Sequence, residues 1–294
     1  PGPRDAGGLA APPRAPAGRS PDAAPPRAAV ARVREVRTLP HPDYCELEAE
    51  APHVARTAAP GQFVHVRIAE DAGGALLRRP FSIAGCEGDV LRLLFKKVGK
   101  LTRRLARLAP GDALDILGPL GRGYDLTVPP ADHAVLVAGG YGVAPLLLLA
   151  RTLRERGLAG RVHFLLGART ADQLLWRDRL AREAWLATRV ATDDGSAGRK
   201  GTVLGLFEEV RASLTGSIRV YACGPMRMLG ALAAGWPDLP LQAAVENQMG
   251  CGLGVCVGCV LPVAGATGYD RYVRICCDGP VFDGRLIDWA ACPS

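Results

Sequence analysis

Four cysteines near the end of the chain have the spacing of a metal-binding site. Cys251, Cys256 and Cys259 form a Cys-x4-Cys-x2-Cys motif, and Cys276 follows with 16 residues between. This is the spacing of plant-type [2Fe–2S] proteins, in which nearby thiolates converge on one side and a distant cysteine closes the cage. Glycines in such a loop permit positive φ angles and let backbone N–H groups approach the sulfides. Here they are Gly250, Gly252, Gly254 and Gly258.

A structural zinc site is the alternative interpretation of these cysteines. Zinc sites usually show paired Cys-x2-Cys units, and only one such unit is present, so the spacing favours iron–sulfur. Because Cys276 and Cys277 are adjacent, the spacing alone leaves the fourth ligand open between them. Cys45, Cys86 and Cys292 are isolated, and we expect them to be buried or incidental.

A second candidate site is the run Arg79, Pro80, Phe81 and Ser82, which stands at an expected strand. The arginine can neutralise a pyrophosphate, and the serine hydroxyl can hydrogen-bond a flavin ring nitrogen. A core strand with a surface arginine would look similar, so this run is weak evidence when taken alone.

A glycine-rich turn between an expected strand and an expected helix is a third candidate. It contains Gly139, Gly140, Gly142 and Pro145. Such a turn lets the backbone approach a pyrophosphate at the helix N-terminus, although this is not the Gly-x-Gly-x-x-Gly fingerprint and a tight turn without a ligand is the alternative. The turn at 223–226 (Cys-Gly-Pro-Met) follows a later strand, and both turns would lie at carboxyl ends of strands, where open sheets bind ligands.

The first half of the chain must position the Arg-Pro-Phe-Ser run, and it is rich in short alternating segments. They cover 30–36, 44–49, 63–68, 89–95 and 113–117. Pro-Gly pairs at 60–61 and 110–111 separate them, which is typical of a small antiparallel barrel. A helix over 102–108 is expected to interrupt this barrel.

From about residue 132 the pattern changes to alternating strands and helices. Strands are predicted at 134–138, 162–166, 189–192, 219–222 and 241–245. Helices are predicted at 145–155, 171–183, 203–214 and 226–235. This alternation argues for a doubly wound parallel sheet. The remaining residues, 246–294, are too few to form a core without a metal.

Composition narrows the classes further. A chain of 294 residues with 48% hydrophobic and 22% charged residues can form two packed domains and a small appendage. The net charge of +7 suits an acidic ligand such as a dinucleotide, while no basic run interleaved with aromatics indicates nucleic-acid binding. No apolar stretch reaches the roughly 18 residues of a membrane span. Nine cysteines without a signal peptide indicate a reducing, cytoplasmic setting.

Taken together, the order of these parts resembles the ferredoxin–NADP reductase superfamily, and within it the electron-transfer subunits of type B dihydroorotate dehydrogenases. The resemblance covers about residues 29–290. Its most specific parts are 246–259 (Glu-Asn-Gln-Met-Gly-Cys-Gly-Leu-Gly-Val-Cys-Val-Gly-Cys) and 276–283 (Cys-Cys-Asp-Gly-Pro-Val-Phe-Asp). The family's last ligand stands two positions before Asp-Gly-Pro, which implies Cys276 rather than Cys277.

The resemblance also implies which residues contact the cofactors. The FAD contacts are Arg79, Pro80, Phe81, Ser82, Leu94, Phe95, Lys96, Leu101 and Thr102. Leu101 departs from the family's usual glycine, which puts the backbone approach there in doubt. The NAD contacts are expected at Gly139, Gly140, Gly142, Pro145, Gly224 and Pro225. Cys223 is expected beside the nicotinamide, as a neighbour of the hydride site and not as a nucleophile.

Four parts are therefore expected: a disordered Pro- and Ala-rich leader (1–28), an antiparallel FAD-binding barrel (29–126), a parallel-sheet NAD-binding domain (127–243) and a [2Fe–2S] module (244–294). The family resemblance implies a relay with a partner. A catalytic subunit with FMN oxidises dihydroorotate to orotate in pyrimidine biosynthesis, and electrons pass singly through the cluster to FAD and then as hydride to NAD⁺. A heterotetramer of two plus two subunits is implied as well.

Two other functions remain open at this stage. One is an NAD(P)H-linked subunit of a sulfide dehydrogenase, sulfite reductase, hydrogenase or bifurcating complex, which would use the same parts with another partner. The other is a non-catalytic zinc-binding interaction protein. The choice between NAD and NADP is also open, because Arg169 after the second strand could meet a 2′-phosphate or be a solvated charge; the family favours NAD.

Overall fold

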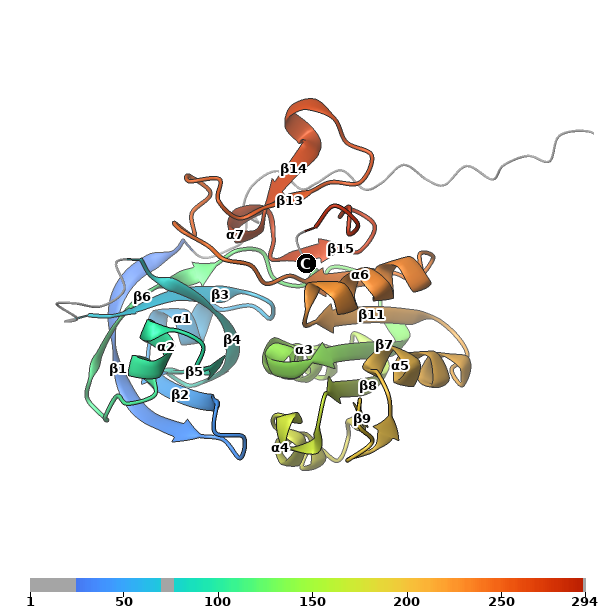
Figure 1. The fold of residues 1–294 in the computed structure, drawn as a ribbon, viewed down its shortest axis with the longest axis horizontal. Coiled ribbons are helices and arrows are strands. Elements are labelled where there is room, and N and C mark those ends of the chain that lie inside the picture. Colours follow the sequence, from blue (N-terminus) through green and yellow to red (C-terminus); the bar gives the residue numbers. More distant parts are fainter. Residues whose placement is uncertain (1–24, 70–76, 293–294) are drawn as a thin grey trace, which may run out of the picture.

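The computed structural model describes residues 25–69 and 77–292 and places a barrel beside a mainly parallel sheet, with a C-terminal segment over both (Figure 1). The predicted leader lies outside the described residues up to residue 24. Its last two residues, Arg27 and Ala28, already belong to the first strand. Within the described part of the chain, none of the helices has the length and apolar character needed to cross a membrane.

In the described residues, six strands close into an antiparallel barrel in the order β1-β2-β5-β4-β3-β6, which confirms the predicted architecture. The strands are β1 (Arg27–Thr38), β2 (Tyr44–Glu50), β3 (Phe63–Ile68), β4 (Arg79–Glu87), β5 (Val90–Lys96) and β6 (Ala113–Leu120). Two short helices accompany them, α1 (Pro52–Thr57) and α2 (Lys100–Leu105). The predicted helix over 102–108 therefore begins and ends earlier than expected.

Strand β3 shows how the alternating pattern serves two interfaces. Val64 and Val66 point into the barrel and are fully buried in its core. Phe63 and His65 point to the other side and are also buried, because the C-terminal segment covers them. The outer side of β3 is thus covered by the segment that carries the cysteine motif, with Gly252 next to His65.

The second sheet has the order β10-β9-β8-β7-β11-β12-β15 in the described chain. Its strands are β7 (Ala131–Gly139), β8 (Ala159–Ala168), β9 (Ala187–Thr192), β10 (Arg199–Lys200), β11 (Ile218–Cys223), β12 (Leu241–Ala244) and β15 (Val281–Asp283). All neighbours are parallel except β15, which runs antiparallel to β12. The chain builds outward from β7 through β8 to β10 and then returns to β11 on the other side of β7. The neighbouring carboxyl ends of β7 and β11 therefore form a topological switch point, where open sheets bind ligands.

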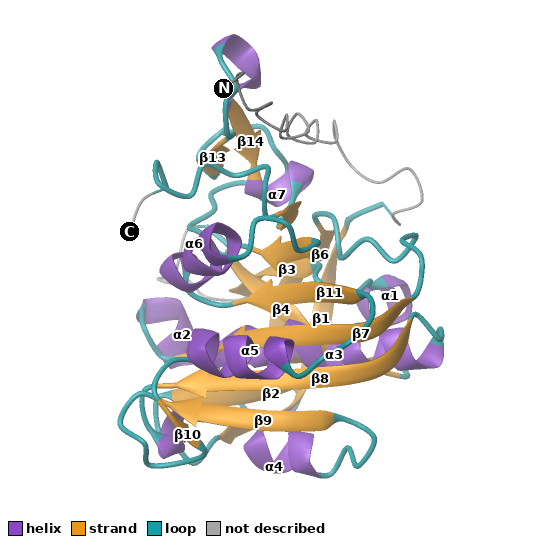
Figure 2. Ribbon diagram, turned by 90° about the vertical axis from the view of Figure 1, so that its right-hand side faces the viewer, coloured by secondary structure: helices purple, strands orange, loops and turns teal. Residues whose placement is uncertain are grey.

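Helices cover both faces of this sheet, as its buried strands require. They are α3 (Val143–Glu155), α4 (Arg177–Ala181), α5 (Val203–Ala212) and α6 (Met226–Gly235). Figures 1 and 2 show α3 and α4 on the face toward the barrel, and α5 and α6 on the opposite face. Helix α3 packs into the core that also contains Ala84 and Leu94 of the barrel, so it joins the two parts.

The helix predicted over 171–183 is wrong in its extent. The chain forms a 3-10 turn η2 (Ala171–Gln173), places Trp176 in the left-handed region at φ 57°, and only then begins α4. The physical reason is that Leu174, Leu175 and Trp176 are all buried. Three consecutive residues cannot lie on one face of a continuous helix, so the helix breaks there.

The C-terminal segment has little regular structure. It contains β13 (Val260–Pro262) paired with β14 (Tyr272–Arg274), the turn η3 (Gly268–Arg271) and the short helix α7 (Ile275–Asp278). Strand β15 comes after the expected domain border at 243/244, yet it belongs to the nucleotide sheet. Outside this segment, the 3-10 turn η1 (Gly140–Gly142) connects β7 to α3.

Candidate functional site

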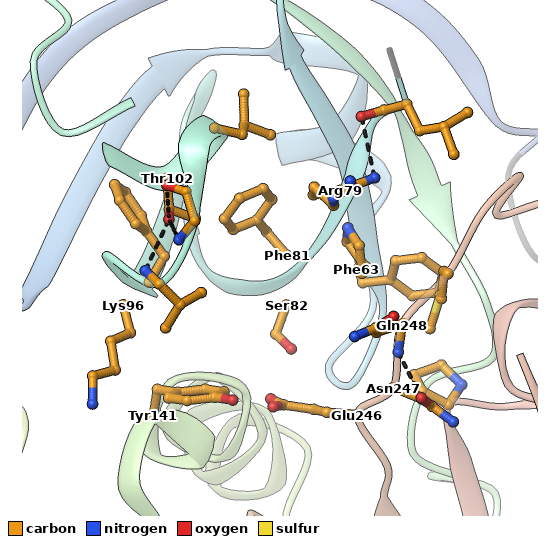
Figure 3. A pocket seen from close by; sticks show the side chains of 18 of the residues that line it. Phe63, Arg79, Phe81, Ser82, Lys96, Thr102, Tyr141, Glu246, Asn247 and Gln248 are labelled. Carbon is orange, nitrogen blue, oxygen red and sulfur yellow. Dashed lines mark hydrogen bonds between the residues drawn. The ribbon is translucent and has the colours of Figure 1, made fainter. Parts of the chain in front are cut away.

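A cavity of about 980 Å³ lies between the barrel and the nucleotide sheet (Figure 3), at the upper end of small-molecule sites, which span about 300–1,000 Å³. One wall comes from β4, β5 and α2. The opposite wall comes from Tyr141 and residues 245–250. All nine residues expected to contact FAD line this cavity: Arg79, Pro80, Phe81, Ser82, Leu94, Phe95, Lys96, Leu101 and Thr102.

The charges around the cavity suit a dinucleotide. Arg79, Lys96 and Lys100 are cations of its lining, and among the described lining residues only the carboxylate of Glu246 opposes them. The Arg79 guanidinium donates to the carbonyls of Leu77 and Arg78 at 3.5 and 3.4 Å and is otherwise exposed. A cation in such weak contacts can bind a diphosphate, and the aromatic and aliphatic walls suit a flavin ring. These residues therefore fit FAD.

Leu101, which departs from the family's usual glycine, is accommodated inside the barrel core. Its side chain is 5% exposed and packs there while also bordering the cavity. The hydroxyl of the next residue, Thr102, accepts hydrogen bonds from the backbone N–H groups of Val98 and Gly99 at 3.0 Å each (Figure 3). The turn at the start of α2 is thus held without a glycine at position 101.

The floor of the cavity holds a group of polar residues from three separate segments. Figure 3 shows the Tyr141 hydroxyl facing the Glu246 carboxylate, with Ser82 pointing toward both from the barrel. Burial raises the pKa of Glu246 to about 7, although the interaction with Tyr141 acts in the opposite direction. Burial, and then the charge of Glu246, also raises the pKa of the nearby Cys223 well above its usual range. This shift of the pKa favours the neutral thiol form of Cys223.

The two predicted glycine turns meet at the switch point of the sheet. Ala138 and Cys223 are paired neighbours at the carboxyl ends of β7 and β11. A Cβ atom on Gly142 would lie 2.2 Å from the carbonyl oxygen of Cys223, so only glycine allows this backbone contact. A Cβ on Gly224 would likewise lie 3.0 Å from the Cα of Gly139.

Helix α3 begins directly after this contact. Its first turn has no acidic residue, and its third residue is Pro145, which lacks an N–H group and is tolerated in the first turn of a helix. The Val143 N–H already donates within the turn η1, and the positive end of the helix dipole at this start is suited to bind a phosphate. The flavin cavity is not bordered by the residues of the two glycine turns, Gly139, Gly140, Gly142, Gly224 and Pro225. Tyr141, however, belongs to the first turn and lines the cavity, so it connects the nucleotide site with the flavin site.

The four predicted cysteine ligands come together as two pairs. The thiol of Cys251 lies at hydrogen-bonding distance from that of Cys256, and the thiol of Cys259 from that of Cys276. In the described part of the chain, no three His, Cys, Asp or Glu side chains group closely enough to hold one metal ion. A [2Fe–2S] cluster takes four thiolates over two irons, so two pairs fit it better than a single tetrahedral zinc ion.

The loop of residues 250–259, here called the cluster loop, is built to admit thiolates. Cβ atoms on Gly250 and Gly258 would lie 3.3 and 3.6 Å from the Cys256 sulfur, so both glycines leave space around it. Val257 has a φ of 54°, a strained conformation for a β-branched residue that is typical of functional loops.

The electrostatics of the cluster loop also favour thiolates. Burial would raise the pKa of Cys251, but N–H groups of Cys256 and Leu253, each 3.4 Å from its sulfur, lower it to about 7. The thiol of Cys276 donates to Cys259, which lowers the pKa of Cys259 to about 6 and raises that of Cys276. The sulfur of Cys277 instead contacts Asp278 at 3.7 Å. The structure thus pairs Cys276, not Cys277, with Cys259.

Sequence reasoning missed one wall of the flavin cavity. Val245, Glu246, Asn247, Gln248 and Met249 line it, although the sequence motif at 246–259 was associated only with the cluster. The motif Glu-Asn-Gln could have indicated this wall. These polar residues follow a buried strand and directly precede the cysteine motif, so they stand between two predicted sites. Arg169 lies exposed immediately after β8, as expected.

Comparison with known proteins identifies two parts of the chain. Residues 246–288 match the model of the iron–sulfur cluster binding domain of dihydroorotate dehydrogenase B. Residues 136–233 match the model of the oxidoreductase NAD-binding domain. The first match covers all four predicted ligands, and the second covers the two glycine turns at the switch point.

Two curated relatives are similar over most of their length, and both are named dihydroorotate dehydrogenase B (NAD⁺), electron transfer subunit. The protein from Geobacillus kaustophilus is 43% identical over 242 residues, which cover 81% of this chain and 90% of the relative. The protein from Desulforamulus reducens is 39% identical over 253 residues, which cover 84% and 94%.

Solved structures share the same architecture. A chain from a study of flavin-based electron bifurcation by NADH-dependent reduced ferredoxin-NADP oxidoreductase aligns with a TM-score of 0.77 and 29% identity, over 89% of this chain and 91% of that one. A ferredoxin NADP⁺ reductase from Neisseria gonorrhoeae with bound FAD and NADP aligns with a TM-score of 0.62 and 20% identity, over 72% and 91%. The latter likeness concerns the fold alone.

Proposed function

The chain belongs to the family of dihydroorotate dehydrogenase B electron-transfer subunits, and on this basis we propose that it passes electrons from an FMN-containing catalytic subunit to NAD⁺. The overall reaction is dihydroorotate plus NAD⁺ to orotate, NADH and a proton. Two electrons and two protons leave dihydroorotate; both electrons and one proton enter NADH, and the other proton is released. The observation that supports this function best is that two cysteine pairs, a cationic cavity and a switch-point edge adjoin one another.

Residues of the barrel would bind FAD. Arg79 and Lys96 would neutralise the diphosphate, and the Ser82 hydroxyl on the cavity wall would be available to hydrogen-bond the flavin ring. When bound, FAD supplies the exchange between one-electron and two-electron steps. The Tyr141 ring and Glu246 line the cavity on the nucleotide side and would border the flavin ring (Figure 3).

Residues at the switch point would bind NAD⁺. The start of α3, with Gly139, Gly140, Gly142 and Pro145, would face its diphosphate, while Gly224 and Pro225 shape the neighbouring turn. Cys223 at the end of β11, whose raised pKa favours the neutral thiol, would lie beside the nicotinamide and would not act as a nucleophile. A neutral thiol would add no negative charge beside that ring.

Cys251, Cys256, Cys259 and Cys276 would hold the [2Fe–2S] cluster, and the cluster loop would face the catalytic partner. Leu253, Val255 and Val257 are 50%, 79% and 57% exposed around the exposed Cys256. Apolar side chains grouped on a surface loop are typical of a protein interface. A partner docked there would bring its own flavin near the cluster, as single-electron transfer requires.

The native complex, purified through a tag on this chain, tests the function. We expect dihydroorotate to drive NAD⁺ reduction in the complex and not with this chain alone. The variant Cys256→Ser should lose the cluster and this coupled reaction while retaining FAD. Coupled turnover in that variant would contradict the relay. If a complex that holds FAD and iron shows no turnover with dihydroorotate, the partner is wrong and a related NAD(P)H-linked complex is the answer.

Two finer points belong to the same proposal. The assembly is proposed to contain two copies of each subunit, which the mass of the purified complex by light scattering tests. The setting is proposed to be the reducing cytoplasm, because the cysteines of the described chain are free and four must remain thiolates. Fractionation of the source cells with a disulfide-trapping reagent tests this point.

A further inference from the structure

A buried histidine stands between the flavin cavity and the cluster loop. His65 lies on the outward side of β3 and is 1% exposed. Its Nε2 atom is buried and has no hydrogen-bond partner among the described residues. Buried polar atoms are nearly always paired, so this one indicates that an acceptor or donor is supplied when the site is loaded.

The outer edge of the imidazole faces the cluster loop. A Cβ atom on Gly252 would lie 2.8 Å from Cε1 and 3.0 Å from both Nδ1 and Nε2 of His65. Gly252 has a φ of 72° and directly follows Cys251, the first predicted ligand. The ring therefore lies against the backbone of the loop beside one cysteine pair.

The other neighbours of His65 belong to the barrel. In the sheet His65 is paired with Pro80 on one side and Leu117 on the other. The ring centroids of His65 and Phe63 are 5.7 Å apart. Pro80 and Phe63 line the flavin cavity. His65 is thus one residue removed from the proposed flavin site and in contact with the proposed cluster site.

We propose that His65 is a positioning residue whose Nε2–H donates a hydrogen bond to a sulfur of the cluster bound at Cys251, and that it thereby raises the reduction potential of that cluster. The inference rests on the proposed function insofar as the cluster must be held by the cluster loop. A bound cluster would place a sulfur atom, which can accept a hydrogen bond, next to the Nε2 of His65, which has no partner among the described residues. A donor to sulfur stabilises the more negative, reduced state, and in a water-excluded site its effect is strong.

The reduction potential of the cluster in the purified complex tests this role. An EPR-monitored redox titration should place the cluster of His65→Leu at a more negative potential than the wild type. For a one-electron couple, a shift of about 59 mV in the reduction potential corresponds to a tenfold change in the equilibrium constant of electron transfer. His65→Gln retains an N–H donor and should recover part of the shift. A potential unchanged in His65→Leu would overturn the proposal.

A second measurement needs no variant that must fold. Wild-type complex labelled with ¹⁵N-histidine should show a weakly coupled histidine nitrogen in the pulsed EPR spectrum of the reduced cluster. Absence of that coupling would also overturn the proposal. His133→Gln, at the amino end of β7, is the matched control and should keep both the coupling and the potential. A wild-type complex with no cluster signal would instead contradict the proposed function itself.

Discussion

Glu46 on β2 is a buried carboxylate that serves three arginines. Its Oε1 atom lies 2.9 Å from Arg37, 3.2 Å from Arg92 and 3.1 Å from Arg179, and Arg179 belongs to α4 of the other part. The carboxylate is 3% exposed, so its loss leaves cations without compensation. We expect Glu46→Gln to lower the free energy of unfolding by about 3 kcal/mol, measured by urea denaturation.

A control for this prediction stands on the same strand. Glu50 pairs with Arg34 at 2.9 Å, but both side chains are about half exposed, at 49% and 54%. Exposed pairs contribute little because water screens them, so Glu50→Gln should cost less than about 1 kcal/mol. Equal losses in the two variants would show that the burial of Glu46 is not the cause.

His163 on β8 predicts how stability depends on pH. Burial, followed by the charges of His133, Arg161 and Arg189, lowers its pKa from 6.5 to about 4. Between these values the unfolded chain binds a proton that the folded chain does not, so stability falls as the pH drops from 6.5 toward 4. In His163→Gln this part of the loss, on the order of 2 kcal/mol, should vanish from denaturation curves. Identical pH slopes in both proteins would contradict the assignment.

At the scale of elements, we expect the contact between the turn η1 and the end of β11 to control nucleotide binding. A methyl group on Gly142 would meet the Cys223 carbonyl at 2.2 Å, and neither partner can move without separating β7 from β11. Gly142→Ala should therefore raise the KM for NADH about tenfold, in a ferricyanide-reduction assay, with FAD content unchanged. Gly235→Ala, where nothing lies within 4 Å of the new methyl, should behave as wild type. A normal KM in Gly142→Ala would separate this contact from nucleotide binding.

Elements were predictable from the sequence where burial repeats with a simple period. The runs at 134–138 and 220–222 are continuous and buried because both faces of β7 and β11 are covered, and the predicted helix over 226–235 matches α6 at both ends. Strands β10 and β15 have two and three residues, too few for any period to show. The break before α4 depends on burying Trp176, which only the assembled fold demands.

At the scale of the whole molecule, the sequence indicated which sites exist but not how they adjoin. The nine residues expected to contact FAD could be named from the sequence and the family resemblance, because they lie on two strands and one short helix of a single barrel. The opposite wall around Glu246 joins them only after some 150 intervening residues have folded into a sheet, which no local pattern encodes. The contact of His65 with Gly252 depends in the same way on barrel and C-terminal segment packing together.

The exposed apolar residues of the cluster loop lead to the final prediction, which concerns the assembly. Val255 is 79% exposed in the cluster loop, next to the predicted ligand Cys256, and a charge there would be buried without compensation if the catalytic partner covers the loop. We expect Val255→Glu to weaken association with the partner at least 100-fold in analytical ultracentrifugation, while iron content and NADH-driven ferricyanide reduction stay normal. Val30→Glu is the matched control, because it places the same charge at another exposed valine, 63% exposed on β1. This variant should associate normally. If Val255→Glu associates as tightly as Val30→Glu, the partner approaches from another face, and the cluster loop must then transfer electrons over a longer distance.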